Sequence, residues 1–141
     1  MRDAIFHLNY IHVLVVTVAG FMLGWLWYSP VLFVKPWMAE MKYTEEHMKA
    51  SAKEGMAKYM LQAFIYTLLS TFGLAVLIAA HGVFNWKHGA AVGAFIGAFG
   101  PGTRLLSGGV WEKRSCKLLA ITVGHEVVLY ALQGAILGFW H

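Results

Sequence analysis

The sequence predicts an all-α integral membrane protein, a four-helix bundle with an amphipathic helix in its first cytoplasmic loop. Of its 141 residues, 59% are hydrophobic and 13% are charged, whereas soluble domains are about half apolar and a quarter charged. Four stretches are apolar over the roughly 20 residues that a helix needs to cross a bilayer. Most basic residues lie between these stretches. We expect a single transmembrane domain that covers residues 1–141.

The four predicted spans are residues 11–33, 59–80, 89–106 and 118–139. The first follows Arg2, as the apolar part of a secretory signal would. Its apolar run is too long for such a signal and has no small-residue cleavage site. We therefore expect this helix to be retained as a membrane span.

The distribution of basic residues predicts the orientation. Nine of the eleven Lys and Arg residues lie between spans one and two or at and after the end of span three. Arg2 and Lys87 fall on the other side. Because positively charged loops stay in the cytoplasm, both long loops are predicted to be cytoplasmic and both termini to lie outside.

The inner border of span one is rich in aromatic residues. Trp27, Tyr28 and Trp37 are expected to anchor this border, since such rings prefer the headgroup level. Pro30 is expected to end the span, because proline cannot continue a helix.

A surface helix is predicted over residues 38–58, in the first cytoplasmic loop. Met41, Met48 and Met56 recur at spacings that keep them on one helical face. Thr44 is a suitable N-cap. We interpret the stripe as the apolar face of an amphipathic helix, and a Cu(I) pathway through the thioethers is the alternative.

Glycines recur at four-residue spacing in three spans, which lets helices approach closely in a membrane. These predicted packing glycines are Gly20, Gly24, Gly89, Gly93, Gly97, Gly134 and Gly138. The pattern does not decide whether the partner helix belongs to the same chain or to a neighbouring subunit. We expect a homo-oligomer or a subunit of a larger membrane complex, in contact with the lipid bilayer.

Span three contains Gly100, Pro101 and Gly102. Proline removes a backbone donor and clashes with the preceding turn, so we expect a helix break here. Backbone groups freed inside a membrane must face protein or water. A small polar cavity beside the break and a packed kink are the two alternatives.

Glu126 is a carboxylate well inside span four, where a charge must be paired or neutralised. His125 is its neighbour, and Arg104 lies near the inner end of span three. An antiparallel hairpin of spans three and four would bring Arg104 towards Glu126. These residues form the candidate intramembrane polar site, either a proton- or ion-coupled site or a structural ion pair.

Several histidines lie at or near the predicted outer face, namely His7, His12, His81, His88 and His141. None has the spacing of helical metal ligands, and we interpret them as interfacial residues. A zinc or copper site at His7, His12, His81 and His88 is the weaker alternative, and haem ligation by His12 and His81 is another. No cofactor is predicted.

The chain resembles a bacterial membrane-protein family catalogued as domain of unknown function seventeen-sixty-one. The most specific part of the resemblance is Trp27–Tyr28–Ser29–Pro30. Further matches are Thr44–Glu45–Glu46, Glu112–Lys113–Arg114 and Ala135–Trp140. The resemblance implies a four-helix protein of the bacterial inner membrane, and it implies no activity, substrate or catalytic residues.

No catalytic, phosphate-binding or metalloprotease motif is present in the sequence, and no nucleic-acid partner is expected. The main hypothesis is a non-enzymatic scaffold or accessory subunit. The alternative is a small channel or proton-coupled transporter centred on Glu126 and the Pro101 break. A membrane enzyme is the third hypothesis, and the sequence does not name its chemistry.

Overall fold

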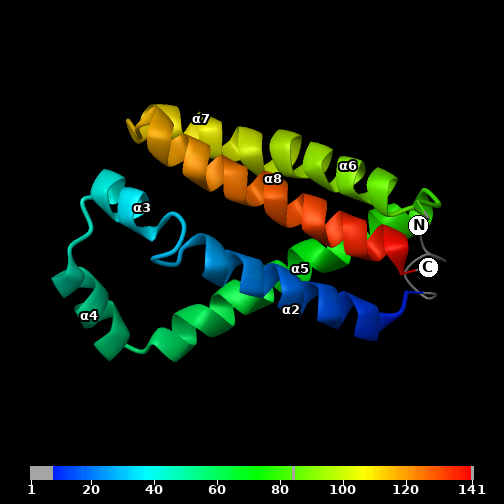
Figure 1. Ribbon diagram of the computed structural model, residues 1–141, viewed down its shortest axis with the longest axis horizontal. Coiled ribbons are helices and arrows are strands. Elements are labelled where there is room, and N and C mark those ends of the chain that lie inside the picture. Colours follow the sequence, from blue (N-terminus) through cyan, green and yellow to red (C-terminus); the bar gives the residue numbers. More distant parts are fainter. Residues whose placement is uncertain (1–7, 84, 141) are drawn as a thin grey trace.

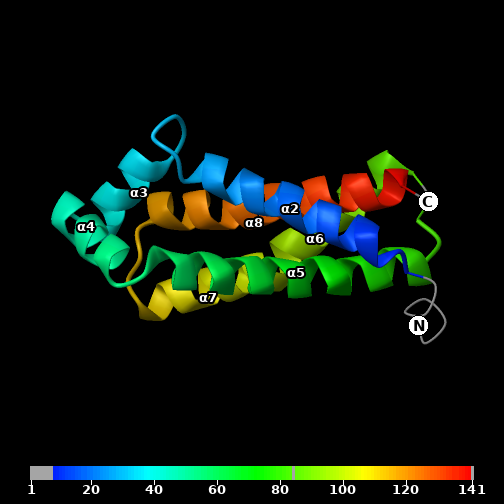
Figure 2. The ribbon, with the colours of Figure 1, turned by 90° about the horizontal axis from the view of Figure 1, so that it is seen from below.

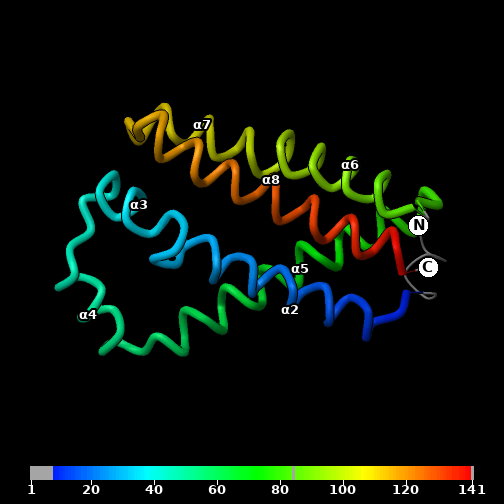
Figure 3. Tube along the Cα trace, in the orientation of Figure 1, coloured from blue at the N-terminus to red at the C-terminus, as the bar shows by residue number. Residues whose placement is uncertain are grey.

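The computed structural model describes residues 8–83 and 85–140, and these residues form helices and no strand. Three helices are long and apolar enough to cross a membrane by length and composition, namely α2 (Tyr10–Trp27), α5 (Met56–Ala80) and α8 (Cys116–Phe139). Between α5 and α8 the chain forms one uninterrupted helical run (Figures 1 and 3), which consists of α6 (Trp86–Gly97), the π-helical segment η1 (Ala98–Gly102) and α7 (Thr103–Trp111).

The long helices run lengthwise, and the chain turns at two opposite ends (Figure 2). The start of α2 and the end of α8 share one end, where the rings of His12 and Trp140 stack with centroids 4.4 Å apart. The other end carries α3 (Val34–Met41) and α4 (Glu45–Lys53). Glu40 of α3 accepts a hydrogen bond from the Ser115 hydroxyl, which holds α3 to the start of α8.

The first predicted span, residues 11–33, is wrong at its C-terminal end. Helix α2 ends at Trp27, and residues 28–33 form turns. Pro30 disfavours the α conformation in the residue before it, so the helix stops before Ser29. The Phe33 N–H then donates to the Trp27 carbonyl at 3.1 Å and closes the turn.

The single surface helix predicted over residues 38–58 is also wrong. The segment contains the end of α3, all of α4 and the start of α5, and α3 ends just before Lys42, whose φ is 53°. Gly55, with a φ of 114°, separates α4 from α5, and this left-handed conformation is one that glycine adopts without steric cost. Thr44 caps α4 as predicted, in a capping box with His47.

Helices α6 and α8 form the most extensive helix pair, and their backbones touch through glycines. A Cβ atom on Gly93 would lie 2.0 Å from the Tyr130 carbonyl oxygen, and one on Gly89 would lie 2.1 Å from that of Gly134. The approach at Gly97 and Gly138 is also too close for a Cβ, at 2.7 Å from a backbone oxygen. These glycines therefore pack within the chain rather than against a neighbouring subunit.

Helix α2 packs against α5 and α8. Val16, Leu74 and Ile78 are fully buried in this part of the core. Gly20 and Gly24 of α2 face α8, since a Cβ on Gly20 would lie 2.9 Å from a methyl group of Leu129. Helix α8 therefore contacts α6 on one side and α2 and α5 on another.

We predict that Gly93→Ala lowers the free energy of unfolding by about 1–3 kcal/mol, because the new methyl group forces α6 and α8 apart. Thermal unfolding in a mild detergent measures this change. Gly73→Ala in α5 is the matched control, since a Cβ there would meet nothing within 4 Å. Equal melting temperatures for the two variants would contradict the close packing of α6 on α8.

Candidate functional site

The Trp27–Pro30 segment forms a compact turn that is fixed to α8. The indole N–H of Trp27 donates to the Ile121 carbonyl at 3.2 Å. Ser29 is buried, and its hydroxyl oxygen accepts from the Val31 N–H at 3.3 Å. The turn thus lies against α8, with the side chains of Trp27 and Ser29 hydrogen-bonded to backbone groups.

Aromatic rings from this turn surround His125 of α8. The centroid of the His125 ring lies 5.3 Å from that of Tyr28 and 5.9 Å from that of Trp27. The ring centroid of Trp37 in α3 lies 5.9 Å from that of Tyr28. The residues predicted as interfacial anchors therefore form a chain of part-buried rings from α3 to His125, while Pro30 is exposed.

His125 and Glu126 interact although they are consecutive in α8. Nδ1 of His125 lies 3.3 Å from Oε1 of Glu126, and the two side chains are 13% and 25% exposed. When Glu126 is ionised, its carboxylate only accepts hydrogen bonds, so this contact then requires the imidazole hydrogen on Nδ1. In the neutral ring, Nε2 is then an acceptor. This atom is buried and has no hydrogen-bond partner among the described residues.

Arg104 lies apart from this pair. Its side chain is exposed at the start of α7, and it forms no ion pair within the described residues. The structure thus brings His125 to Glu126 and leaves Arg104 out of the candidate polar site.

The chain passes Pro101 without leaving the helix. Gly100, Pro101 and Gly102 lie in the π-helical segment η1, and α7 continues from it directly. A π-bulge absorbs the missing backbone donor by locally changing the hydrogen-bond pattern. A Cβ on Gly102 would lie 3.3 Å from a methyl group of Val123, so the segment packs against α8 one turn before Glu126.

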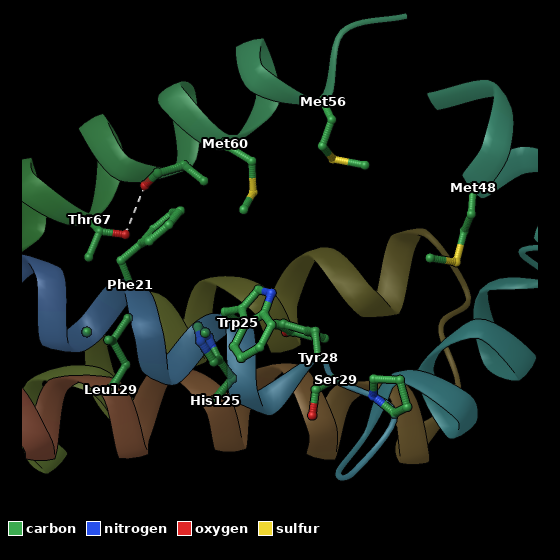
Figure 4. Close-up of a pocket in the computed structure, with 14 residues that line it drawn as sticks. Phe21, Trp25, Tyr28, Ser29, Met48, Met56, Met60, Thr67, His125 and Leu129 are labelled. Carbon is green, nitrogen blue, oxygen red and sulfur yellow. Dashed lines mark hydrogen bonds between the residues drawn. The ribbon is translucent and has the colours of Figure 1, made fainter. Parts of the chain in front are cut away.

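A pocket of about 640 Å³ lies between α2, α4, the first half of α5 and α8 (Figure 4). His125 and Leu129 reach it from α8. Aromatic residues of α2 and its following turn line a second side, and methionines of α4 and α5 line a third, the latter being Met48, Met56 and Met60. These methionines are about 40% exposed, so they border open space rather than fill a core.

The histidines proposed as metal ligands are dispersed. Within the described residues, no group of three or more His, Cys, Asp or Glu side chains is arranged to hold a metal ion. His12 stacks on Trp140, and Nδ1 of His81 lies 2.9 Å from the Leu77 carbonyl oxygen. His88 is exposed, and His7 and His141 lie outside the described residues.

Sequence reasoning missed Gln133 and the convergence of the pocket residues. Gln133 is fully buried, its amide donates to the Thr71 hydroxyl at 2.8 Å, and its Oε1 has no partner among the described residues. A lone amide in an apolar span was the available signal, because polar groups in lipid are costly.

Met60 lies four residues after Met56, one turn further along the same helical face, which was a signal for the methionine wall.

We predict that Thr71→Val lowers the free energy of unfolding by about 1–2 kcal/mol, because it leaves the buried Gln133 amide without its partner. Combining it with Gln133→Leu is expected to cost less than the sum of the single changes. Equilibrium unfolding of the four proteins in detergent measures this coupling. Thr103→Val is the control, because the Thr103 hydroxyl donates to a carbonyl four residues earlier, as that of Thr71 does, but it has no hydrogen bond with Gln133. If the effects of Thr71→Val and Gln133→Leu on the free energy of unfolding simply add, the hydrogen bond between these two side chains would be contradicted.

Comparison with known proteins gives a family and no characterised relative. No curated protein and no solved structure matches the chain. The model of one family, described as "Protein of unknown function (DUF1761)", matches residues 11–138. This match includes the Trp27–Pro30 turn, the pocket and the His125–Glu126 pair. The chain therefore belongs to the DUF1761 family.

Proposed function

We propose that this protein is a non-enzymatic, four-span protein of the bacterial inner membrane that serves as a scaffold or accessory subunit. In addition to α2, α5 and α8, we assign as a span the helical run Trp86–Trp111, which is span three along the chain, is antiparallel to α8 and packs along it. The run has a π-helical segment inside it, which membrane helices tolerate when neighbouring protein covers the altered backbone.

The distribution of charge supports the proposed orientation. The lysines of α3, α4 and their flanking turns lie at the end that also carries Lys113, Arg114 and Lys117. At the opposite end, the described residues include one Lys or Arg side chain, that of Lys87. Since the positive end is expected to face the cytoplasm, the start of α2 and the end of α8 are proposed to lie on the outer side.

The observation that carries the accessory role is the unpartnered first half of α5. Residues 56–63 are all exposed, and Tyr66 and Leu69 further along are 67% and 62% exposed. Figure 1 shows this half of α5 diverging from α2 towards α4. The packing glycines of α6 and α8 are already used within the chain, so α5 is the helix that we assign to contacts with another subunit.

A proton-coupled transporter is the second candidate. It is favoured by the position of η1, because a Cβ on Gly97, just before it, would lie 2.7 Å from the Glu126 carbonyl oxygen. A helix segment with an altered hydrogen-bond pattern therefore adjoins the His125–Glu126 pair. A change in this segment would reach the backbone of Glu126, whose carboxylate is the group proposed to carry the proton.

The orientation predicts the accessibility of Cys116, which is exposed at the first turn of α8. A membrane-impermeant thiol reagent is expected to leave Cys116 unlabelled in spheroplasts and to label it after lysis. A Cys116→Ser/His88→Cys variant is the control, since His88 is exposed at the opposite end, and it should react before lysis. Labelling of Cys116 in sealed spheroplasts would reverse the proposed orientation.

Native mass spectrometry of the gently extracted protein tests the accessory role. We expect a species larger than the 15.7 kDa chain, either a small multiple of this mass or a complex with another protein. Tyr66→Ala on α5 is expected to reduce this species, because it removes a large exposed ring from the proposed contact. Val110→Ala, equally exposed on α7, should not. A monomer under all gentle conditions would favour the transporter.

A further inference from the structure

The pocket between α2, α4, α5 and α8 has the composition of a site for an uncharged organic molecule. Its volume of about 640 Å³ lies in the range of sites for drug-sized ligands, which are mostly apolar with few orienting polar groups. No Lys, Arg, Asp or Glu side chain lines it. A ligand with a full charge would therefore be held in an apolar space without a counter-ion, which is costly.

The pocket walls favour a flat ring over a flexible acyl chain. Phe21, Trp25 and Tyr28 lie on one side and the methionines on the other (Figure 4). Aromatic side chains attract a ligand ring by offset or edge contacts, and thioether sulfurs make favourable contacts with ring edges. The three methionines are spread along the wall rather than directed at one point, an arrangement that suits a ring better than a metal ion.

The polar group at the base of the pocket determines which ring substituent fits. With Glu126 ionised, the Nδ1–H of His125 donates to its carboxylate, and Nε2 is then a buried acceptor without a partner among the described residues. On α2, a Cβ at Gly24 would lie 3.4 Å from Nε2. Because Nε2 is buried beside Gly24, a ligand hydroxyl that bonds to it must displace the atoms that cover it, and a side chain at position 24 would leave less room for that hydroxyl.

We propose that the pocket binds an uncharged, ring-bearing amphiphile of the phenol or quinol class, whose hydroxyl donates a hydrogen bond to Nε2 of His125. The inference rests on the proposed membrane embedding, because the ligand enters from the lipid past the exposed Trp25 and Met60. It holds for an accessory subunit and for a transporter alike, since it concerns binding and no chemical step.

The test compares 4-octylphenol with its methyl ether, 4-octylanisole, which has the same ring and no donor. The full chain is reconstituted in phosphatidylcholine nanodiscs, and empty nanodiscs correct for partition into lipid. Affinities come from the concentration dependence of thermal stabilisation. We expect the phenol to bind roughly five- to tenfold more tightly than the ether, as one hydrogen bond predicts. The ¹⁵N shift of His125 Nε2 should change with the phenol alone.

His125→Phe keeps a ring in place and removes the acceptor, so the preference for the phenol should disappear while the affinity for the ether stays within about twofold. His88→Phe, at the far end of the molecule, is the matched control and should keep the preference. Gly24→Ser is a second variant in case His125→Phe does not fold. Its hydroxyl would itself pair with Nε2 and remove the preference, whereas Gly24→Ala supplies no donor and should retain more of it.

Equal affinities of phenol and ether for the unaltered protein would overturn the proposal, as would an unchanged preference in His125→Phe. Absence of saturable binding by a folded, nanodisc-embedded chain would also overturn it, and the four-span accessory role would stand. A chain that does not enter nanodiscs as a folded protein would overturn both, and cysteine labelling would then show the failed membrane topology directly.

Discussion

The direct backbone contact between α6 and α8 is the constraint on which the other parts of the structure depend. At Gly89, Gly93 and Gly134 the helices are closer than any side chain would allow. Lipid tails are as apolar as the helix surfaces, so no hydrophobic effect drives two helices together inside a membrane. Such close packing is then a main source of helix association. It holds η1 against the turn of α8 that carries Val123 and Glu126, and it makes α8 a fixed surface for α2 and α5.

Helix α2 is attached to the surface of α8. The Trp27 indole binds the Ile121 carbonyl, and the rings of Trp27 and Tyr28 lie beside His125. Gly20 and Gly24 allow α2 to approach α8. Helix α5 joins this core through its second half, where Leu74 and Ile78 are buried. Its first half diverges, and the divergence creates both the pocket and the exposed surface that we assign to a partner.

The accuracy of the sequence predictions varied with how local each feature was. Thr44 was predicted as an N-cap and caps α4, because capping depends on a few adjacent residues. The single surface helix over residues 38–58 failed at Gly55, whose left-handed backbone ends one helix before the next begins. The ion pair of Arg104 with Glu126 was proposed from antiparallel order alone, and the rotation of α7 about its axis leaves Arg104 exposed instead.

The sequence by itself determined the helical class, three apolar helices long enough to cross a membrane and the concentration of positive charge at one end, because composition and periodicity reflect the solvent that each segment meets. Its motifs also determined the family. Tertiary structure alone decided that the glycines pair within the chain and that Gln133 bonds Thr71. It also decided that methionines of α4 and α5 meet His125 across one pocket. These features depend on the rotation and tilt of each helix relative to its neighbours, which no local pattern specifies.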